Sequence, residues 1–173
     1  LESHTISELR DPATRPEEGE HVAVSGTLVG WTVSGTHYTF WLQEAGGGPR
    51  SGMMFETDRS THFVDDVSFR DFAVGDVLDV RGSYETAFGG ELDFVQAIVI
   101  GDTGVSEDVA VANVSDLCTI GTGGVDADDY EHVLLEFTDA VVTDENPDAP
   151  SDFGEVEIGP IGESGCLRVD DYF

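Results

Sequence analysis

The sequence has no lysine and only seven arginines, against 36 aspartates and glutamates, so its formal net charge at pH 7 is -29. Phosphate contacts made by lysine and arginine supply most of the non-specific affinity of proteins for nucleic acid. Because the seven arginines are scattered, they cannot form a basic groove, and nucleic acid is disfavoured as a partner. The charge also repels itself, and salt near ~1 M screens that repulsion. The composition indicates either adaptation to salt or divalent cations, or simply solvated acidic faces.

Several other features that would point to a particular class of protein are missing. No stretch approaches the ~18 consecutive apolar residues of a membrane span. No nucleophile elbow and no phosphate-binding loop occurs. The five histidines show no metal-like spacing, and they are His4, His21, His37, His62 and His132. We therefore predict no membrane span and no catalytic activity.

The chain has only two cysteines, Cys118 and Cys166, and no Cys-x-x-Cys motif. An even pair in an acidic, lysine-free chain favours a disulfide formed outside the cytoplasm, so we predict an extracytoplasmic protein. The alternative is two buried, reduced thiols.

Alternating apolar and polar residues dominate, and no stretch of ten or more residues shows helical periodicity. The first part of the chain predicts three strands, an irregular connection and then a hairpin across residues 87–90. This is the order of strands in an oligonucleotide/oligosaccharide-binding (OB) barrel, a five-stranded Greek-key fold. The predicted strands are residues 21–32, 37–44, 51–57, 76–84 and 91–100. We assign residues 1–104 to this first OB-like barrel.

The second part repeats the beginning of the first. Residues 6–9 (ISEL) recur as 114–117 (VSDL), and residues 20–22 (EHV) recur as 131–133. Repetition at this period indicates tandem domains. A long alternating strand (residues 133–143) and two shorter ones follow the second copy. We therefore predict an all-β protein with tandem OB-like barrels.

The second barrel, residues 105–173, is predicted to contain only its first three strands. Three strands leave an open edge and an exposed apolar face, which soluble proteins avoid. Either the native polypeptide continues beyond Phe173, or another segment or subunit completes the barrel. We favour the first explanation.

Short motifs in both copies resemble a family of secreted bacterial OB-type domains, which occur beside extracellular nucleases and in surface lipoproteins. The motifs are ISEL (6–9), FWLQE (40–44), GPRSGM (48–53), VGDVLDVRG (74–82), NPD (146–148), FGE (153–155) and VDD (169–171). The resemblance implies a tandem OB architecture and an extracytoplasmic address. It also implies an accessory module without catalytic residues.

A candidate calcium loop lies between the predicted strands of the second copy. Counted from Asp144, oxygen-bearing side chains stand at positions 1, 3, 5, 9 and 12, the ligand spacing of a calcium loop. These residues are Asp144, Asn146, Asp148, Asp152 and Glu155. The loop lacks the glycine expected at position 6, and strands rather than helices flank it. The alternative is an ordinary loop whose acids face solvent.

Exposed aromatic residues are the usual means by which an OB face binds its ligand. Alternation in residues 37–44 places His37 and Trp41 on the face opposite Tyr38, Phe40 and Leu42. If the second set forms the core, the first set lies on the outer surface. The predicted ligand-binding residues are Trp31, His37, Trp41 and Met54. Alternatively, these side chains belong to the core or to a domain interface.

Together these patterns predict a non-catalytic binding or assembly module of a bacterial surface or secreted protein. Its partner would be a protein or a carbohydrate, which need no positive charge on this chain. The alternative is the accessory OB region of a secreted nuclease or phosphoesterase, whose catalytic domain would lie outside these residues. The polypeptide encoded after Phe173 would distinguish the two.

Overall fold

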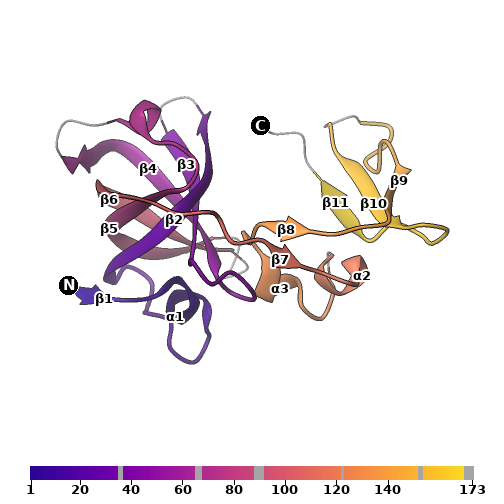
Figure 1. Ribbon diagram of the computed structural model, residues 1–173, viewed down its shortest axis with the longest axis horizontal. Helices are drawn as coiled ribbons and strands as arrows, with labels where there is room; N and C mark the ends of the chain where they lie inside the picture. The colour runs from indigo at the N-terminus through magenta and orange to yellow at the C-terminus, as the bar shows by residue number, and fades with distance from the viewer. Residues whose placement is uncertain (35–36, 65–67, 88–91, 122, 152–153, 170–173) are drawn as a thin grey trace. The chain divides into compact units, whose positions relative to one another are not determined.

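The computed structural model describes residues 1–34, 37–64, 68–87, 92–121, 123–151 and 154–169. The chain divides into two compact units (Figure 1). Unit 1 consists of Leu1–Val111 and His132–Leu134, and unit 2 of Ala112–Glu131 and Leu135–Phe173. Strands predominate in the described residues, so the predicted all-β class is confirmed.

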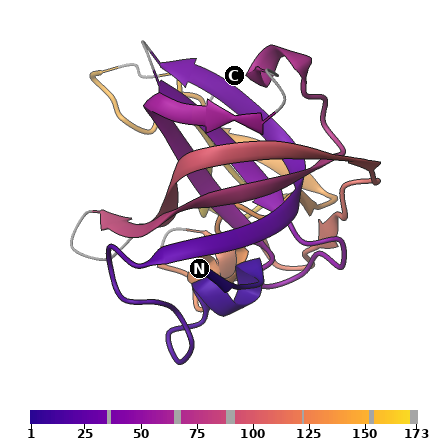
Figure 2. The same cartoon turned by 90° about the vertical axis from the view of Figure 1, so that its left-hand side faces the viewer.

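Unit 1 is a barrel with OB strand order. Its sheet runs β1-β2-β3-β4-β6-β5, and a further pairing between β2 and β5 closes it. β4 and β6 pair in parallel, as do β1 and β2, whereas the other neighbouring strands of the sheet pair antiparallel. The strands wrap around a common axis in Figure 2. The elements are β1 (Glu2–Ser3), α1 (Ile6–Arg10), β2 (His21–Ser34), β3 (His37–Gln43), β4 (Gly52–Phe63), the 3-10 helix η2 (Phe69–Asp71), β5 (Asp76–Ala87) and β6 (Leu92–Ser106). The predicted hairpin turn at residues 87–90 falls mostly outside the described residues.

The two-residue period of the strands sorts side chains between the core and the outside of the barrel. In β5, Leu78, Val80 and Tyr84 are fully buried, whereas Asp79 and Arg81 between them are exposed. Gly82, also buried, is two residues from Val80 and from Tyr84, and a Cβ there would lie 2.2 Å from the carbonyl oxygen of Gln96. The core therefore lies inside the barrel, as the alternation predicts.

Two short helices bring apolar side chains into this core. Helix α1 begins with a capping box, in which Thr5 and Glu8 satisfy each other's backbone N–H groups, and it buries Ile6 and Leu9. The hydrogen bond from the Thr5 backbone lowers the pKa of Glu8. At η2, Phe69 packs against a group of aromatic rings with centroids 4.7–5.9 Å away. These rings are Trp31, Tyr38, Phe40, Phe63 and Phe72.

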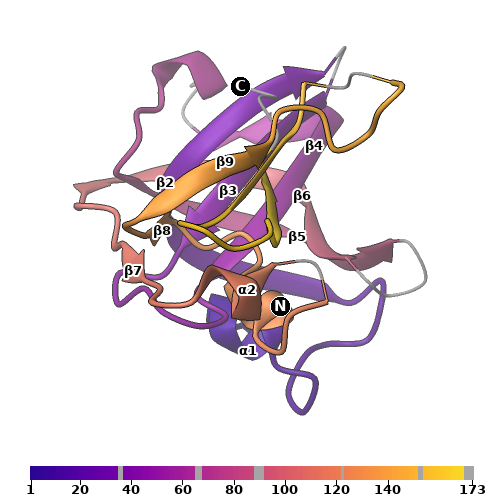
Figure 3. The ribbon, with the colours of Figure 1, turned by 90° about the vertical axis from the view of Figure 1, so that its right-hand side faces the viewer.

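Unit 2 is smaller and contains two sheets. An antiparallel sheet has the order β11-β10-β9, and β7 pairs with β8 in parallel. The elements are β7 (Ala112–Asn113), α2 (Leu117–Ile120), α3 (Ala127–Tyr130), β8 (Leu135–Glu136), β9 (Ala140–Asp144), β10 (Val156–Pro160) and β11 (Leu167–Val169). Figure 3 shows β9, β10 and β11 as neighbouring strands.

The single long strand predicted over residues 133–143 is wrong. The structure divides this stretch into β8 and β9, with Asp139 between them at a φ of 61°. This left-handed conformation interrupts an extended strand, and aspartate tolerates it better than most residues do.

The beginning of unit 2 has the same local order as the beginning of unit 1. In each, a two-residue strand leads through a short helix to a strand that pairs with it in parallel, although in unit 2 a second short helix, α3, comes before that strand. A side chain caps each helix, Thr5 in α1 and Asp116 in α2. Each helix buries two apolar residues three positions apart. That unit 2 is part of a second OB barrel stays a prediction.

Candidate ligand-binding face

Five residues form a continuous row across the strands of the unit 1 barrel. The pairings Gly30–Trp41, Trp41–Met54, Met54–Phe94 and Phe94–Glu85 carry it from β2 through β3, β4 and β6 to β5. Directly opposed residues have Cβ atoms about 4.5–5.5 Å apart, so their side chains are neighbours. We call this set the outer row.

The outer row faces away from the core. The residues that flank Trp41 on β3, Phe40 and Leu42, are fully buried, as are Met53 and Phe55 on either side of Met54. Because alternate residues of a strand point to opposite faces, Trp41 and Met54 point outward. Both are partly exposed, as is Phe94 on β6. Large apolar side chains on the outer face of an OB barrel are of the kind that contacts ligands.

One end of the outer row is open because of Gly30. A Cβ placed at Gly30 would have no heavy atom within 4 Å, so the space beside Trp41 on the β2 side is unfilled. At the other end stands the carboxylate of Glu85, which accepts a 2.7 Å hydrogen bond from the Ser83 hydroxyl. The row thus runs from open space across an apolar centre to a negative charge.

A second carboxylate borders the apolar centre on β4. Glu56 is two residues from Met54 on the same face, and it is paired with Thr39 on β3 and Gln96 on β6. Glu56 is partly exposed. One carboxylate thus lies beside the apolar centre on β4, and another stands at the β5 end of the row.

The segment His132–Leu134 packs against the ends of β3 and β4. Gln43 is fully buried, and its side chain both donates to the Ala110 carbonyl and accepts from the Leu134 N–H at 2.7 Å. Gly52 is required here, because a Cβ would lie 2.0 Å from the His132 carbonyl oxygen. Burial, together with the charge of Arg10, lowers the pKa of His132 to about 4. This segment therefore covers Gln43 and Gly52, each two residues from a member of the outer row on its strand.

The four residues predicted to bind ligand are only partly brought together. Trp41 and Met54 are direct cross-strand neighbours. His37 lies on the same face of β3, four residues from Trp41, with its Nδ1 atom 2.9 Å from the Thr57 carbonyl oxygen. Trp31 pairs with the buried Phe40 and packs on Tyr38, with ring centroids 5.9 Å apart, so it lies on the opposite face. Ligand contact by His37 and Trp31 stays a prediction.

Sequence reasoning missed Phe94, Glu56 and Glu85 as members of this face. The alternation in residues 94–97, with Val95 and Ala97 buried, carries the signal that Phe94 points outward. The alternation does not give the strand register, however. The register places Phe94 beside Met54, although the two residues are 40 positions apart in the sequence.

In the loop predicted to bind calcium, an arginine lies between two of the predicted ligands. The Arg168 guanidinium donates from Nη1 to Asp148 at 2.8 Å and to Glu155 at 3.2 Å, and the bond to Asp148 raises the pKa of Arg168. The Oδ1 atom of Asp144 accepts from the backbone of Asn146. Asp152 lies outside the described residues. No group of three or more metal-binding side chains occurs among the residues that the structure covers, and calcium stays a prediction.

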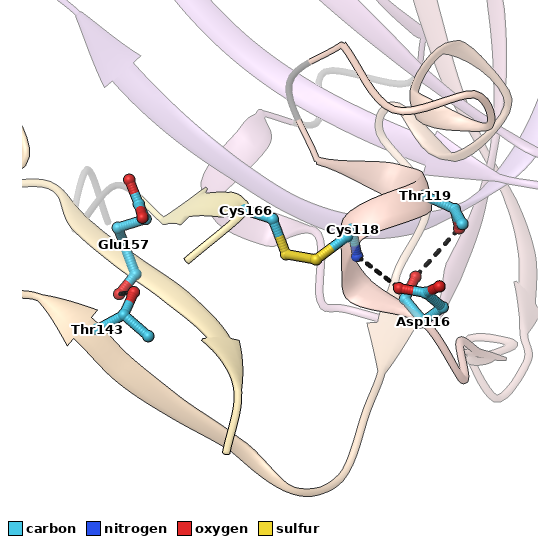
Figure 4. The surroundings of a disulfide bond; sticks show 6 residues. All are labelled: Asp116, Cys118, Thr119, Thr143, Glu157 and Cys166. Atoms are coloured by element: carbon cyan, nitrogen blue, oxygen red, sulfur yellow. Dashed lines mark hydrogen bonds between the residues drawn. A yellow bond between two sulfur atoms is a disulfide. The ribbon is translucent and has the colours of Figure 1, made fainter. Parts of the chain in front are cut away.

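The predicted pairing of Cys118 with Cys166 is confirmed (Figure 4). Asp116 caps α2 beside it, accepting a 2.9 Å hydrogen bond from the Cys118 backbone N–H, while Thr119 donates to the Asp116 carbonyl. The disulfide therefore joins α2 to the residue preceding β11. The alternative of two reduced thiols is wrong, and a disulfide is typical of an oxidising environment.

In the part of the chain that the structure describes, no helix is both long and apolar enough to cross a membrane.

Comparison with known protein families and with curated proteins finds no match to this sequence. Among solved structures, the chain is similar to an OBody bound to hen egg-white lysozyme, with 17% identity and a TM-score of 0.45 over 60% of this chain and 93% of that one. It is also similar to the aspartyl-tRNA synthetase of Entamoeba histolytica, with 12% identity and a TM-score of 0.46. That match covers 62% of this chain and only 22% of the synthetase.

Proposed function

We propose that this protein is a non-catalytic, extracytoplasmic binding module that holds a protein or carbohydrate partner on the outer row of its first barrel. The observation that carries the proposal is the row itself. Trp41, Met54 and Phe94 are adjacent, outward-facing and partly exposed, although the barrel has a complete core without them. Aromatic side chains on the face of an OB barrel are suited to stacking and apolar contact.

The disulfide and the charge support an extracytoplasmic, salt-adapted address. Disulfides persist in oxidising compartments and are rare in the cytosol. A net charge of -29 keeps a protein soluble in concentrated salt, where self-repulsion is screened. The same charge opposes nucleic acid as the partner, because the chain offers no cluster of cations to neutralise phosphates.

The local order of unit 2 supports a tandem arrangement. Its parallel pair, capped helix and three-stranded antiparallel sheet resemble the elements at the start of unit 1, except that β8 and β9 belong to separate sheets whereas β2 serves in both pairings. In this proposal unit 2 is part of a second OB barrel, and the two units together form an assembly module.

Titrations with defined probes test the proposal. The probes are a neutral β-linked hexasaccharide, a basic peptide and single-stranded DNA, each followed by calorimetry for the wild-type chain and for Trp41→Ala. The matched control is Trp31→Phe, which changes the other tryptophan of the chain on the opposite face of β2. We expect the saccharide or the peptide to bind, with binding lost in Trp41→Ala and kept in the control. Preferential binding of DNA, or binding indifferent to Trp41, would contradict the proposal.

A further inference from the structure

The sequence contains one acceptor pattern for the attachment of a sugar chain to asparagine. Asn113, Val114 and Ser115 follow the pattern Asn-x-Ser/Thr, in which the middle residue is not proline. The other asparagine of the chain, Asn146, is followed by proline and aspartate, so it lies outside the pattern. We propose that Asn113 is a site of N-glycosylation, with an oligosaccharide attached through its side-chain amide. This inference rests on the extracytoplasmic address in the proposed function.

The first argument is that the acceptor side chain is accessible. Asn113 and Ser115 are both exposed, and Val114 between them is partly buried. Among the residues that the structure describes, the side-chain amide of Asn113 takes part in no hydrogen bond, and neither does the hydroxyl of Ser115. The amide nitrogen that would receive the sugar is therefore not engaged by the fold.

The second argument is that the fold gives no other reason for an amide at this position. The chain has 36 aspartates and glutamates but only two asparagines. Asparagine favours turns, and Asn146 begins one, in which its carbonyl oxygen accepts a hydrogen bond from the Ala149 N–H. Asn113 lies instead in strand β7, and asparagine is depleted in strands. The acceptor pattern accounts for an exposed amide in such a place.

The third argument is the position of β7 in unit 2. β7 consists of Ala112 and Asn113, which pair in parallel with Leu135 and Glu136 of β8. Within the described residues, β7 has no strand on its other side (Figure 1). A two-residue strand at an edge can separate locally from its neighbour without opening a core. The enzyme that attaches the sugar can therefore reach Asn113 after folding as well as before it.

A sugar chain on β7 is also compatible with the tandem architecture proposed for this protein. The corresponding strand of unit 1 is β1, which pairs with β2 at the edge of its sheet. Ser3 corresponds to Asn113, since each is the second residue of its strand, and Ser3 is also exposed. On its other side β2 pairs with β5. By this correspondence, a sugar on β7 leaves free the side of β8 on which a second barrel would be completed.

The attachment forms one bond and breaks one. The side-chain nitrogen of Asn113 bonds to the anomeric carbon of a sugar that is activated by a phosphate or diphosphate ester to a carrier. The bond from that carbon to the phosphate oxygen breaks, and the carrier phosphate leaves with the bonding electrons. The nitrogen gives up one of its two protons, so the product is a neutral amide and nothing is oxidised or reduced. The attached group is bulky and well solvated, as an exposed strand permits.

The test is the mass of a single peptide from the protein isolated from its source organism. Cleavage before aspartate releases residues 108–115, in which Asn113 is the only asparagine. Tandem mass spectrometry of this peptide gives both the mass of the sugar and the residue that holds it. The variants, expressed in the same organism, are Asn113→Gln and Ser115→Ala, which break the pattern, and Ser115→Thr, the matched control, which keeps it. Resistance of Cys118 and Cys166 to alkylation without reductant verifies the folding of each variant.

We expect a sugar on Asn113 in the wild-type chain and in Ser115→Thr, and its complete loss in the other two variants. An unmodified peptide from protein recovered outside the cytoplasm, with its disulfide intact, would overturn the inference but keep the proposed address. An unmodified peptide from protein recovered in the cytoplasm would overturn both. A sugar that persists in either variant that breaks the pattern would also overturn the inference, because its attachment would not depend on the pattern.

Discussion

Reduction of the disulfide between Cys118 and Cys166 should unfold unit 2 and leave unit 1 folded. The bond joins residues 48 positions apart. By the loop-entropy relation, closing a loop of this length destabilises the unfolded chain by about 4 kcal/mol. A small unit has little other stability with which to compensate for such a loss.

The two units differ sharply in the apolar core that would remain after reduction. All of the large apolar cluster lies in unit 1, between Ile6 and Ile100. Among the described residues of unit 2, the buried apolar side chains are Leu117, Ile120 and Ile158. The first two belong to α2, the helix that holds Cys118. Losing the disulfide therefore removes the link that keeps α2 joined to the β11 side of the unit.

Hydrogen exchange followed by mass spectrometry measures the effect in each unit separately. A loss of about 4 kcal/mol corresponds to about a thousandfold faster exchange, up to the limit of the unfolded chain. We expect this acceleration in peptides from β9 to β11 of the reduced protein and of Cys118→Ser. Peptides from β2 to β6 should be unaffected. Both tryptophans lie in unit 1, so their fluorescence melt should also be unchanged. Acceleration of less than about tenfold in unit 2, or an equal effect in unit 1, would refute the reasoning.

Three further predictions concern separate parts of the chain. Gly52→Ala should lower the free energy of unfolding of unit 1 by about 1–3 kcal/mol in denaturant titrations, because its Cβ would meet the His132 carbonyl at 2.0 Å. Gly30→Ala, whose Cβ would have nothing within 4 Å, should leave that free energy nearly unchanged. Equal effects of the two substitutions would contradict the packing of His132 against Gly52. The pKa of His132 is lowered to about 4 from an ordinary value near 6.5, so the unfolded chain binds the extra proton first as the pH falls. The stability contributed by neutral His132 should thus be present above about pH 6.5 and should decline by up to about 3 kcal/mol towards pH 4. The reference is His132→Asn, in which this decline should be absent. Parallel plots of unfolding free energy against pH for the two proteins would exclude the prediction. If the loop of residues 144–155 binds calcium, a chelator should lower the melting temperature of unit 2 at low salt, and an unchanged melt would remove the calcium prediction.

The sequence was sufficient for the barrel because each local signal agreed with the global fold. Alternation places Phe40 and Leu42 of β3 in the core, and both are fully buried. By contrast, the role of Gln43 depends on partners 67 and 91 residues away, Ala110 and Leu134. No local pattern encodes contacts at that separation, so a buried glutamine at the end of a strand could not be recognised.

The candidate site shows the same division between local and distant information. Trp41 and Met54 could be assigned to the outside because the two-residue period holds along β3 and β4. The sequence also predicts ligand contact by Trp31, yet a register shift between Leu28 and Gly30 brings Trp31 opposite the buried Phe40. A β-bulge reverses the face of every residue beyond it, and its position is a matter of sheet pairing. Predicting that reversal would have required the pairing of β2 with β3.

The placement of the scarce arginines explains how so acidic a chain keeps a negative surface while folding. Arg15 pairs with the buried Asp93 at 3.3 Å, Arg50 with Asp11 at 3.5 Å, and Arg168 with two acids of unit 2. Exposed pairs of this kind stabilise a fold little. Their consequence is instead that these cations already have counterparts within the chain. Glu56 and Glu85 beside the outer row have no arginine counterpart among the described residues, so the repulsion between such carboxylates is screened only by dissolved cations. The stability of unit 1 should therefore rise as the salt concentration increases.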